Sequence, residues 1–216
     1  MPLALFRRAR QPQTEKKNRL HIGCGPVLLP GWINVDIGSY PGIDRRLDVR
    51  DGLPYADLRF IFAEHFIEHL SYDDGARLLA DCRRALAPDG VLRLSTPNLD
   101  WVWMTQYHLG NWGGRDEAVR DCFWMNKAFR GWGHQFLYNL QTLTETLHQA
   151  GFAEIVSCRY GESTHEELRG IERHEQYTDT PELPHIIIVE ASGSRSMPSQ
   201  LLTGPLADYR QAIESE

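Results

Sequence analysis

The sequence predicts an α/β fold built on a mostly parallel sheet, and three observations carry this prediction. Short apolar runs alternate with helical stretches from residue 20 onward. Gly, Pro or Asp follows most of these runs, as is typical of the turns between strands and helices. The chain has 216 residues, of which 42% are hydrophobic and 24% are charged. This composition indicates one globular domain with a sizeable core.

The predicted strands are short, as expected for a sheet of this kind. They span residues 20–23, 32–36, 46–49, 58–63, 91–95, 153–160 and 185–192. A helix is predicted over residues 72–87, because Leu78, Leu79, Cys82 and Leu86 have helical spacing before the turn sequence APDG. A second helix is predicted in LTETLHQ and ends at Gly151.

The link between the first two strands is unusually short. Only PVLLPG separates Gly25 from the strand that begins at Trp32. A crossover helix between parallel strands needs about ten or more residues. The first crossover is therefore predicted to be shortened to a turn.

Composition and charge exclude several functions. The net charge of −6 argues against a protein that coats nucleic acid. The four cysteines lie far apart and form no C-x-x-C pair, and the N-terminus does not read as a signal peptide, so a reducing, cytoplasmic location is expected. No apolar run approaches the roughly 18 to 20 residues that a membrane span needs. The oligomeric state is left open.

The stretch LHIGCGPVLLPGWINVDIG, residues 20–38, holds the first functional signal. Gly23 and Gly25 follow one predicted strand and Asp36 ends the next, where ligands of open parallel sheets bind. Glycine lets the backbone approach a ligand, and a carboxylate can accept from two ribose hydroxyls. A dinucleotide fingerprint is a poor match, because Leu28 stands at its third glycine position and Asp36 follows Gly25 by only 11 residues.

Further segments follow in a recognisable order. Asp48 lies in LDVRDGLPY, Glu64 and His65 lie in FIFAEHFIEHL, and LAPDGVLRLSTPN comes next. From Arg19 to about Asn98, and again in GHQFLYNLQTLTETLHQAGF and the last strand, the chain resembles the class I S-adenosylmethionine-dependent methyltransferases, especially their small-molecule branch.

The resemblance implies a Rossmann-like sheet with an antiparallel late strand and S-adenosylmethionine as the cofactor. It implies a methyltransferase domain at residues 19–191, between a basic N-terminal arm at 1–18 and a C-terminal tail at 192–216. The basic arm is expected to be solvated, although apolar residues before its basic run leave a membrane-surface role open.

The resemblance implies cofactor contacts at eight positions: Gly23, Cys24, Gly25, Asp36, Ile37, Asp48, Val49 and Glu64. The glycine turn would meet the methionine end, Asp36 the ribose and Ile37 the adenine ring. Asp48 would accept from the adenine amino group beside Val49, and the backbone near Glu64 would approach the sulfonium. Both aspartates could instead be ordinary turn caps.

Residues 99–139 interrupt the alternation of strands and helices, and residues 99–135 hold five of the six tryptophans. Because they follow the fifth strand, they emerge at the ligand face and are predicted to form an aromatic lid. The predicted substrate-binding residues are Trp103, His108, Trp112, Trp132 and Tyr138. The tryptophans could equally form a small core of their own.

The predicted reaction is methyl transfer to a small-molecule acceptor, with a sugar or glycan precursor favoured. His134 is the first candidate for a general base and His65 the second. The stretch HFIEH also matches the H-x-x-E-H pattern of zinc peptidases, so a hydrolase using His65, Glu68 and His69 is an alternative. A non-catalytic cofactor-binding relative is a third possibility. The favoured site contains no metal.

Overall fold

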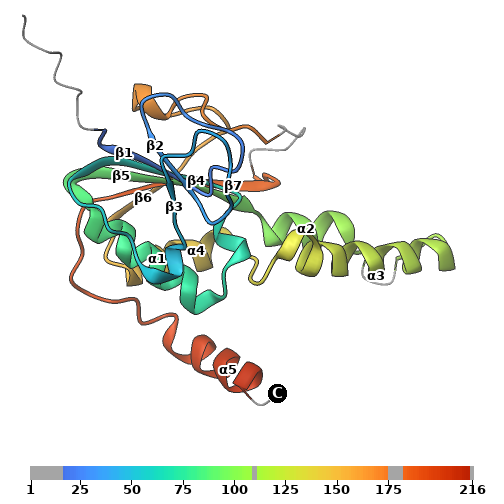
Figure 1. Cartoon of the computed structure of the whole chain (residues 1–216). Coiled ribbons are helices and arrows are strands. Elements are labelled where there is room, and N and C mark those ends of the chain that lie inside the picture. The colour runs from blue at the N-terminus through green and yellow to red at the C-terminus, as the bar shows by residue number, and fades with distance from the viewer. Residues whose placement is uncertain (1–16, 109–110, 175–181, 215–216) are drawn as a thin grey trace, which may run out of the picture.

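The computed structural model describes residues 17–108, 111–174 and 182–214. A seven-stranded sheet in the order β3-β2-β1-β4-β5-β7-β6 lies at its centre (Figure 1). The strands are β1 (Arg19–Ile22), β2 (Ile33–Asp36), β3 (Arg45–Arg46), β4 (Leu58–Glu64), β5 (Leu86–Pro97), β6 (Glu154–Ser157) and β7 (Ile186–Ser192).

The sheet is parallel except at one strand. β1 pairs in parallel with β2 and β4, and the parallel pairing continues to β3 on one side and β5 on the other. β7 lies antiparallel between β5 and β6. The predicted α/β fold with an antiparallel late strand is confirmed. The carboxyl ends of β1, β2, β4 and β5 consequently meet at one edge, where ligands of such sheets bind.

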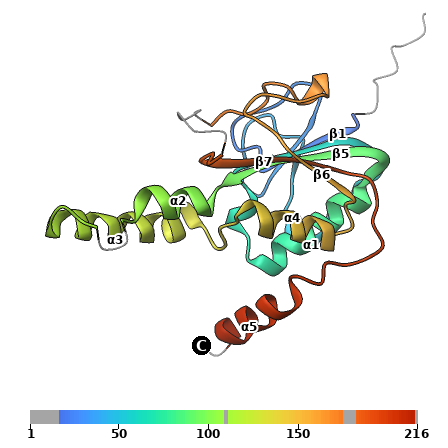
Figure 2. The same cartoon turned by 180° about the vertical axis from the view of Figure 1, so that it is seen from behind.

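Two helices, α1 (Tyr72–Ala85) and α4 (Leu140–Gln149), cover one face of the sheet (Figures 1 and 2). α1 begins at Ser71, whose hydroxyl accepts from the backbone N–H of Asp74, and it ends in the basic residues Arg83 and Arg84. Both features stabilise a helix, the first by capping and the second by complementing the helix dipole. The apolar sides of these helices pack on β4 and β5 and form the main core.

The other face of the sheet is covered mainly by coil rather than by α-helices. Phe60 and Phe62 point to this face from β4, where they pack with Leu29 and Trp32 of the β1–β2 link. The segment of residues 158–174, with the short 3-10 helix η4 (Glu166–Leu168), covers the rest. This second core is smaller than the main core.

The β1–β2 link contains no helix, which confirms the predicted shortening of the first crossover. The buried side chain of Asn34 organises this link. Its Oδ1 accepts from the backbone N–H of Leu29 at 2.8 Å, and its Nδ2 donates to the carbonyls of Leu29 and Trp32, each at 3.1 Å. One side chain thus satisfies backbone groups that an intact helix would satisfy internally.

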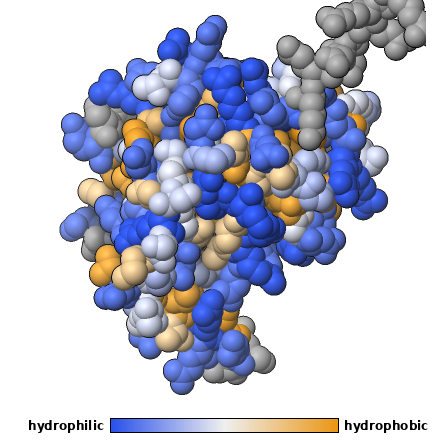
Figure 3. All heavy atoms as spheres, turned by 90° about the vertical axis from the view of Figure 1, so that its left-hand side faces the viewer, coloured by the Kyte–Doolittle hydropathy of each residue, from blue (hydrophilic) through white to orange (hydrophobic). Residues whose placement is uncertain are grey.

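Two further helices, α2 (Leu99–Gln106) and α3 (Arg115–Arg130), lie side by side and project from the edge of the sheet (Figures 1 and 2). A 3-10 turn, η3 (Gly131–Gly133), follows α3. Figure 3 shows the side of the molecule away from α3, where hydrophilic residues predominate. The projecting helices are the part of the fold that strand and helix periodicity did not predict.

Several element boundaries differ from the predictions. The strand predicted at 46–49 is shorter, because Val49–Asp51 form a 3-10 turn, η1, capped by Asp48. The helix predicted over 72–87 ends at Ala85, since Leu86 already pairs with Leu58 of β4. The predicted C-terminal tail contains helix α5 (Thr203–Glu214). Most of the basic arm lies outside the described residues.

None of the helices within the described ranges combines the length and apolarity needed to cross a bilayer.

Candidate active site

A cavity of about 1180 Å³ opens at the edge where β1, β4 and β5 end. The glycine turn after β1 and the 3-10 turn η2 (Ile67–His69) form one part of its wall. Helices α2 and α3 and the residues after η3 form another part. Residues 171, 173 and 174 close it from the coil-covered face. The cavity therefore joins the predicted cofactor turn to the aromatic insertion.

The structure brings about half of the predicted site residues to this cavity. Those on its wall are Gly23, Cys24, Gly25, Glu64, His65, Trp132 and His134. Those away from its wall are Asp36, Ile37, Asp48, Val49, Trp103, His108, Trp112 and Tyr138. Of the second group, Asp36 ends β2 and Ile37 follows it, whereas Asp48 caps η1 and Val49 begins it.

The glycine turn is fixed by sterics. Gly23 and Gly25 have φ of 66° and 52°, in the left-handed region that favours glycine. A Cβ atom on Gly23 would lie only 2.2 Å from the ring of Phe66. Burial, helped by the negative charge of Asp36, raises the pKa of the Cys24 thiol to about 11. Cys24 is therefore a neutral thiol at neutral pH and no nucleophile.

Asp36 holds the glycine turn in place. One carboxylate oxygen accepts from the backbone N–H of Gly25 at 2.9 Å, and the other accepts from Gly38 at 2.7 Å. A carboxylate oxygen can accept more than one hydrogen bond, so acceptor positions are left for a ribose. Ile37 follows with 52% of its surface exposed, as a residue that packs on adenine would need.

Asp48 has a structural task in this conformation. Its carboxylate caps η1 and receives the Arg50 guanidinium through both oxygens. These hydrogen bonds lower the pKa of the Asp48 carboxyl to about 2. The turn-cap interpretation thus holds for Asp48, and an adenine contact would share this carboxylate with Arg50. The neighbouring Val49 is buried.

His65 and Glu68 form a pair on the cavity wall. His65 follows β4 with a left-handed backbone, φ 45°, which is strained for a non-glycine residue. Its Nδ1 lies 3.2 Å from Oε1 of Glu68, and its ring stacks on His174 with centroids 3.8 Å apart. Glu68 is fully buried, and its Oε2 accepts from the hydroxyl of Thr96 at 3.0 Å.

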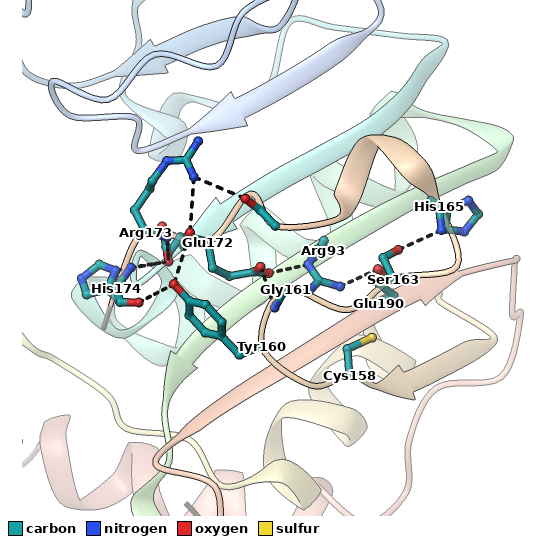
Figure 4. A network of polar contacts seen from close by, with 12 residues as sticks. Arg93, Cys158, Tyr160, Gly161, Ser163, His165, Glu172, Arg173, His174 and Glu190 are labelled. Carbon is teal, nitrogen blue, oxygen red and sulfur yellow. Dashed lines mark hydrogen bonds and ion pairs between the residues drawn. The ribbon is translucent and has the colours of Figure 1, made fainter. Parts of the chain in front are cut away.

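The segment that carries His174 is tied to the sheet by a buried ionic network (Figure 4). Arg93 of β5 donates to Glu172 and to Glu190, each at 2.6 Å, with both guanidinium and carboxylates inside the protein. Glu64, at the end of β4, accepts from the backbone N–H groups of Arg173 and His174 at 2.8 and 3.1 Å. Glu64 thus shapes the cavity through this segment as well as through its own backbone.

His134 faces the cavity in a defined orientation. Its Nδ1 lies 2.8 Å from the carbonyl of Ala128, so Nδ1 is the donor and Nε2 is left toward the cavity. Its ring lies 5.2 Å from that of His69 and 5.7 Å from that of Trp132, measured between centroids. His134 and Trp132 therefore lie side by side on the cavity wall.

Other predicted substrate-binding residues have structural roles. His108 and Trp112 both donate to the buried carboxylate of Asp121, which fixes the turn between α2 and α3. Trp103 packs against Tyr107 on the outside. Tyr138 is fully buried in the main core, so it lies away from the cavity. None of these four residues lines the cavity.

The sequence pattern missed residues that the structure brings to the wall. Trp101 and Trp124 line the cavity in place of Trp103 and Trp112. A helix predicted over residues 99–106 would have placed Trp101 and Trp103 on different faces, so that only one of them could line the cavity. No local signal singled out His174, because contacts distant in sequence place it.

The zinc-peptidase arrangement does not form in HFIEH. That pattern needs two histidines one turn apart on a helix. Here only Ile67–His69 are helical, as a single 3-10 turn, and His65 precedes them with a left-handed backbone. His65 and His69 therefore do not share a helix face.

The strand order, the antiparallel β7, the glycine turn after β1 and the acid after β2 together define a class I S-adenosylmethionine-dependent methyltransferase. A family model described as a methyltransferase domain matches residues 3–157. The chain belongs to this family, and S-adenosylmethionine is its cofactor.

Solved structures agree with this fold. The CMeT domain of the citrinin polyketide synthase superposes with a TM-score of 0.50 and 16% identity, covering 87% of this chain and 49% of that chain. The methyltransferase SibL gives a TM-score of 0.51 and 13% identity, covering 86% and 53%.

The chain thus spans about half the length of these two structures. At these identities the likeness shows the fold alone. None of the curated proteins matches the sequence.

Proposed function

We propose that the protein transfers the methyl group of S-adenosylmethionine to a small-molecule acceptor held in the cavity, with a sugar or glycan precursor as the favoured class. The observation that carries the proposal is that one cavity is walled by the cofactor turn, by histidines and by tryptophans. The cofactor, the base and the acceptor would therefore meet at the carboxyl edge of the sheet.

The cofactor would lie across the ends of β1, β2 and β4. Its methionine end would contact the turn of Gly23, Cys24 and Gly25, and its ribose would lie at Asp36. The adenine ring would rest on Ile37, next to Val49 and Asp48. The methyl group would then point into the cavity past Glu64. Both remaining acceptor positions of Asp36 support this placement, since a ribose supplies two hydroxyl donors.

Methyl transfer is an in-line displacement, so alignment and exclusion of water supply much of the acceleration. The acceptor oxygen would lose its proton to a histidine and form a bond to the methyl carbon while the carbon–sulfur bond breaks. His65 is the proposed base, because it lies on the cavity wall and the Glu68 carboxylate beside Nδ1 would orient its ring. His134, the first candidate from sequence, would then contact the acceptor.

Trp101, Trp124 and Trp132 give the acceptor side of the cavity aromatic walls. Aromatic rings offer large, rigid contact area for a cyclic acceptor, which supports a sugar. Helices α2 and α3 would act as the predicted lid over the methyl donor. A cytoplasmic location is proposed because all four cysteines are free thiols, as expected of a reducing compartment.

The test is a screen of metabolite pools with S-adenosylmethionine carrying an isotope-labelled methyl group, read by mass. The proposal expects a labelled small molecule. With that acceptor, His65→Ala and His134→Ala should each lower turnover roughly a hundredfold while leaving cofactor affinity nearly unchanged. His148→Gln, on α4 and away from the cavity, is the matched control. A protein that binds the cofactor but labels nothing would be a non-catalytic relative.

A further inference from the structure

Three metal-ligand side chains meet on the cavity wall. The ligand atoms of Glu68, His69 and His134 all lie within 4.8 Å of one another, and all three residues line the cavity. Glu68 and His69 belong to η2, whereas His134 follows η3, far along the chain. The juxtaposition is therefore made by the fold and not by a local sequence pattern.

Hydrogen bonds hold the two segments together. The backbone N–H groups of Gln135 and Phe136 donate to the carbonyl of Glu68 at 2.8 and 3.3 Å. The side-chain amide of Gln135 donates to the carbonyl of His69 at 2.6 Å. The three side chains are thus presented by backbones that are already fixed to each other, as a pre-organised site requires.

Glu68 supplies a second, independent observation. Its side chain is fully buried, and its Oε1 has no hydrogen-bond partner, although Nδ1 of His65 lies 3.2 Å away. A buried carboxylate is costly unless its charge is compensated. A cation bound to this carboxylate, together with His69 and His134, would supply that compensation.

The surroundings orient two of the ligands. The carbonyl of Ala128 accepts from Nδ1 of His134 and leaves Nε2 as the coordinating atom. The hydroxyl of Thr96 donates to Oε2 of Glu68 and leaves Oε1 for the cation. Metal-binding histidines and carboxylates are commonly fixed by such hydrogen bonds from behind.

We propose that Glu68, His69 and His134 bind a divalent transition-metal cation that holds the methyl acceptor through its oxygen. Two imidazoles and one carboxylate suit such a cation, and three protein ligands leave coordination positions open for the acceptor. The role in acceptor binding rests on the proposed methyltransferase function, but the cation site itself does not. His134 would act here as a ligand, in agreement with His65 as the base.

The chemistry balances without a redox change. An acceptor hydroxyl bound to the cation would be more acidic and would give up its proton to a base in the cavity. The oxygen then donates an electron pair to the methyl carbon, and the pair of the broken carbon–sulfur bond stays on sulfur. The products are the methyl ether and S-adenosylhomocysteine, and the cation keeps its charge.

The test is a titration of the purified full chain with Co²⁺, followed by visible absorption. We expect saturation at one ion per chain. His69→Ala and Glu68→Gln should each weaken the Co²⁺ affinity roughly tenfold or more, whereas His148→Gln should match the wild type. Thermal transitions of each variant confirm folding, and His134→Ala serves as the second variant if either of the first two unfolds.

Wild type without a saturable Co²⁺ spectrum, or with the same Co²⁺ affinity as His69→Ala, would overturn the inference. Calorimetry with S-adenosylhomocysteine on the same samples separates the two proposals. A chain that binds S-adenosylhomocysteine but not Co²⁺ keeps the proposed function and loses the metal site. A chain that binds Co²⁺ but not S-adenosylhomocysteine loses the proposed function and keeps the metal site.

Discussion

The two sides of the cavity are built in opposite ways. On the cofactor side, β4 is almost entirely buried, and side chains such as Asn34 and Asp36 fix the loops through backbone hydrogen bonds. On the acceptor side, α2 and α3 bury few side chains and leave large ones in solvent, among them Met104 at 69% and Phe123 at 71% exposure.

The cofactor side of the cavity is therefore tightly packed, whereas the acceptor side is loosely packed. A rigid sheet edge can hold a cofactor that is common to the family, whereas a lightly packed insertion can adapt to a particular acceptor. Variants on the two sides should therefore differ both in size of effect and in the property that changes.

The largest effect is expected at Arg93, which binds Glu172 and so ties residues 171–174 to the sheet. Arg93→Met would leave Glu172 and Glu190 as buried carboxylates without a counter-charge, and we expect the free energy of unfolding to fall by about 3–5 kcal/mol. Urea unfolding measures this. Arg84→Met, which removes an exposed ion pair with Asp81, is the control and should cost about 1 kcal/mol or less. Equal effects would mean that the buried network contributes no more than a surface pair.

Gly23→Ala should affect both stability and cofactor binding. The left-handed backbone alone costs an alanine about 1–2 kcal/mol, and the added methyl also collides with Phe66. Gly31→Ala is the matched control, since Gly31 has φ 80° but open space around its Cβ position. We expect calorimetry to show cofactor affinity lowered roughly tenfold or more for Gly23→Ala and little changed for Gly31→Ala. If Gly23→Ala binds the cofactor normally, the glycine turn does not contact the cofactor.

Asp36→Ala tests the ribose contact more directly. Loss of a charge-assisted hydrogen bond should weaken cofactor binding by about 1.5–3 kcal/mol. The variant should still fold, although the glycine turn loses two backbone hydrogen bonds. Asp51→Ala, which removes an exposed carboxylate of η1, is the control in the same titration. If Asp36→Ala binds like the wild type, Asp36 is a turn residue only.

The smallest effect is expected on the acceptor side. Phe123→Ser removes an exposed ring from α3 and should change the free energy of unfolding by no more than about 0.5 kcal/mol. Met125→Ala, on the buried side of the same helix, should cost more, about 2 kcal/mol. Thermal unfolding of both variants measures the contrast. A larger loss for Phe123→Ser than for Met125→Ala would show that the Phe123 ring is covered in solution. It would contradict the loose packing of α2 and α3.

The same contrast explains what could be predicted from the sequence. The sheet, the short first crossover and the glycine turn follow from local periodicity, spacing and glycine chemistry. The helices α2 and α3 were not predicted, because aromatic residues on several faces of a helix hide its period. Tyr138 was predicted to contact the substrate but lies in the core, because its burial beside Gly75 depends on packing between segments distant in sequence.

The residues that close the cavity could not be predicted from the sequence either. His174 stacks on His65 from a segment that Glu64 and the Arg93 network hold against the sheet. Likewise, Glu68 and His134 meet through backbone hydrogen bonds between distant segments. No residue spacing in the sequence predicts such contacts, because they join segments far apart along the chain.

The central claim is that the glycine turn and Asp36 hold S-adenosylmethionine at the edge of the sheet. Calorimetric titration of the full chain with S-adenosylhomocysteine tests it most directly. The account predicts one site with a low-micromolar Kd, about −8 kcal/mol, that Asp36→Ala and Gly23→Ala weaken. No heat and no thermal shift at millimolar ligand would contradict it.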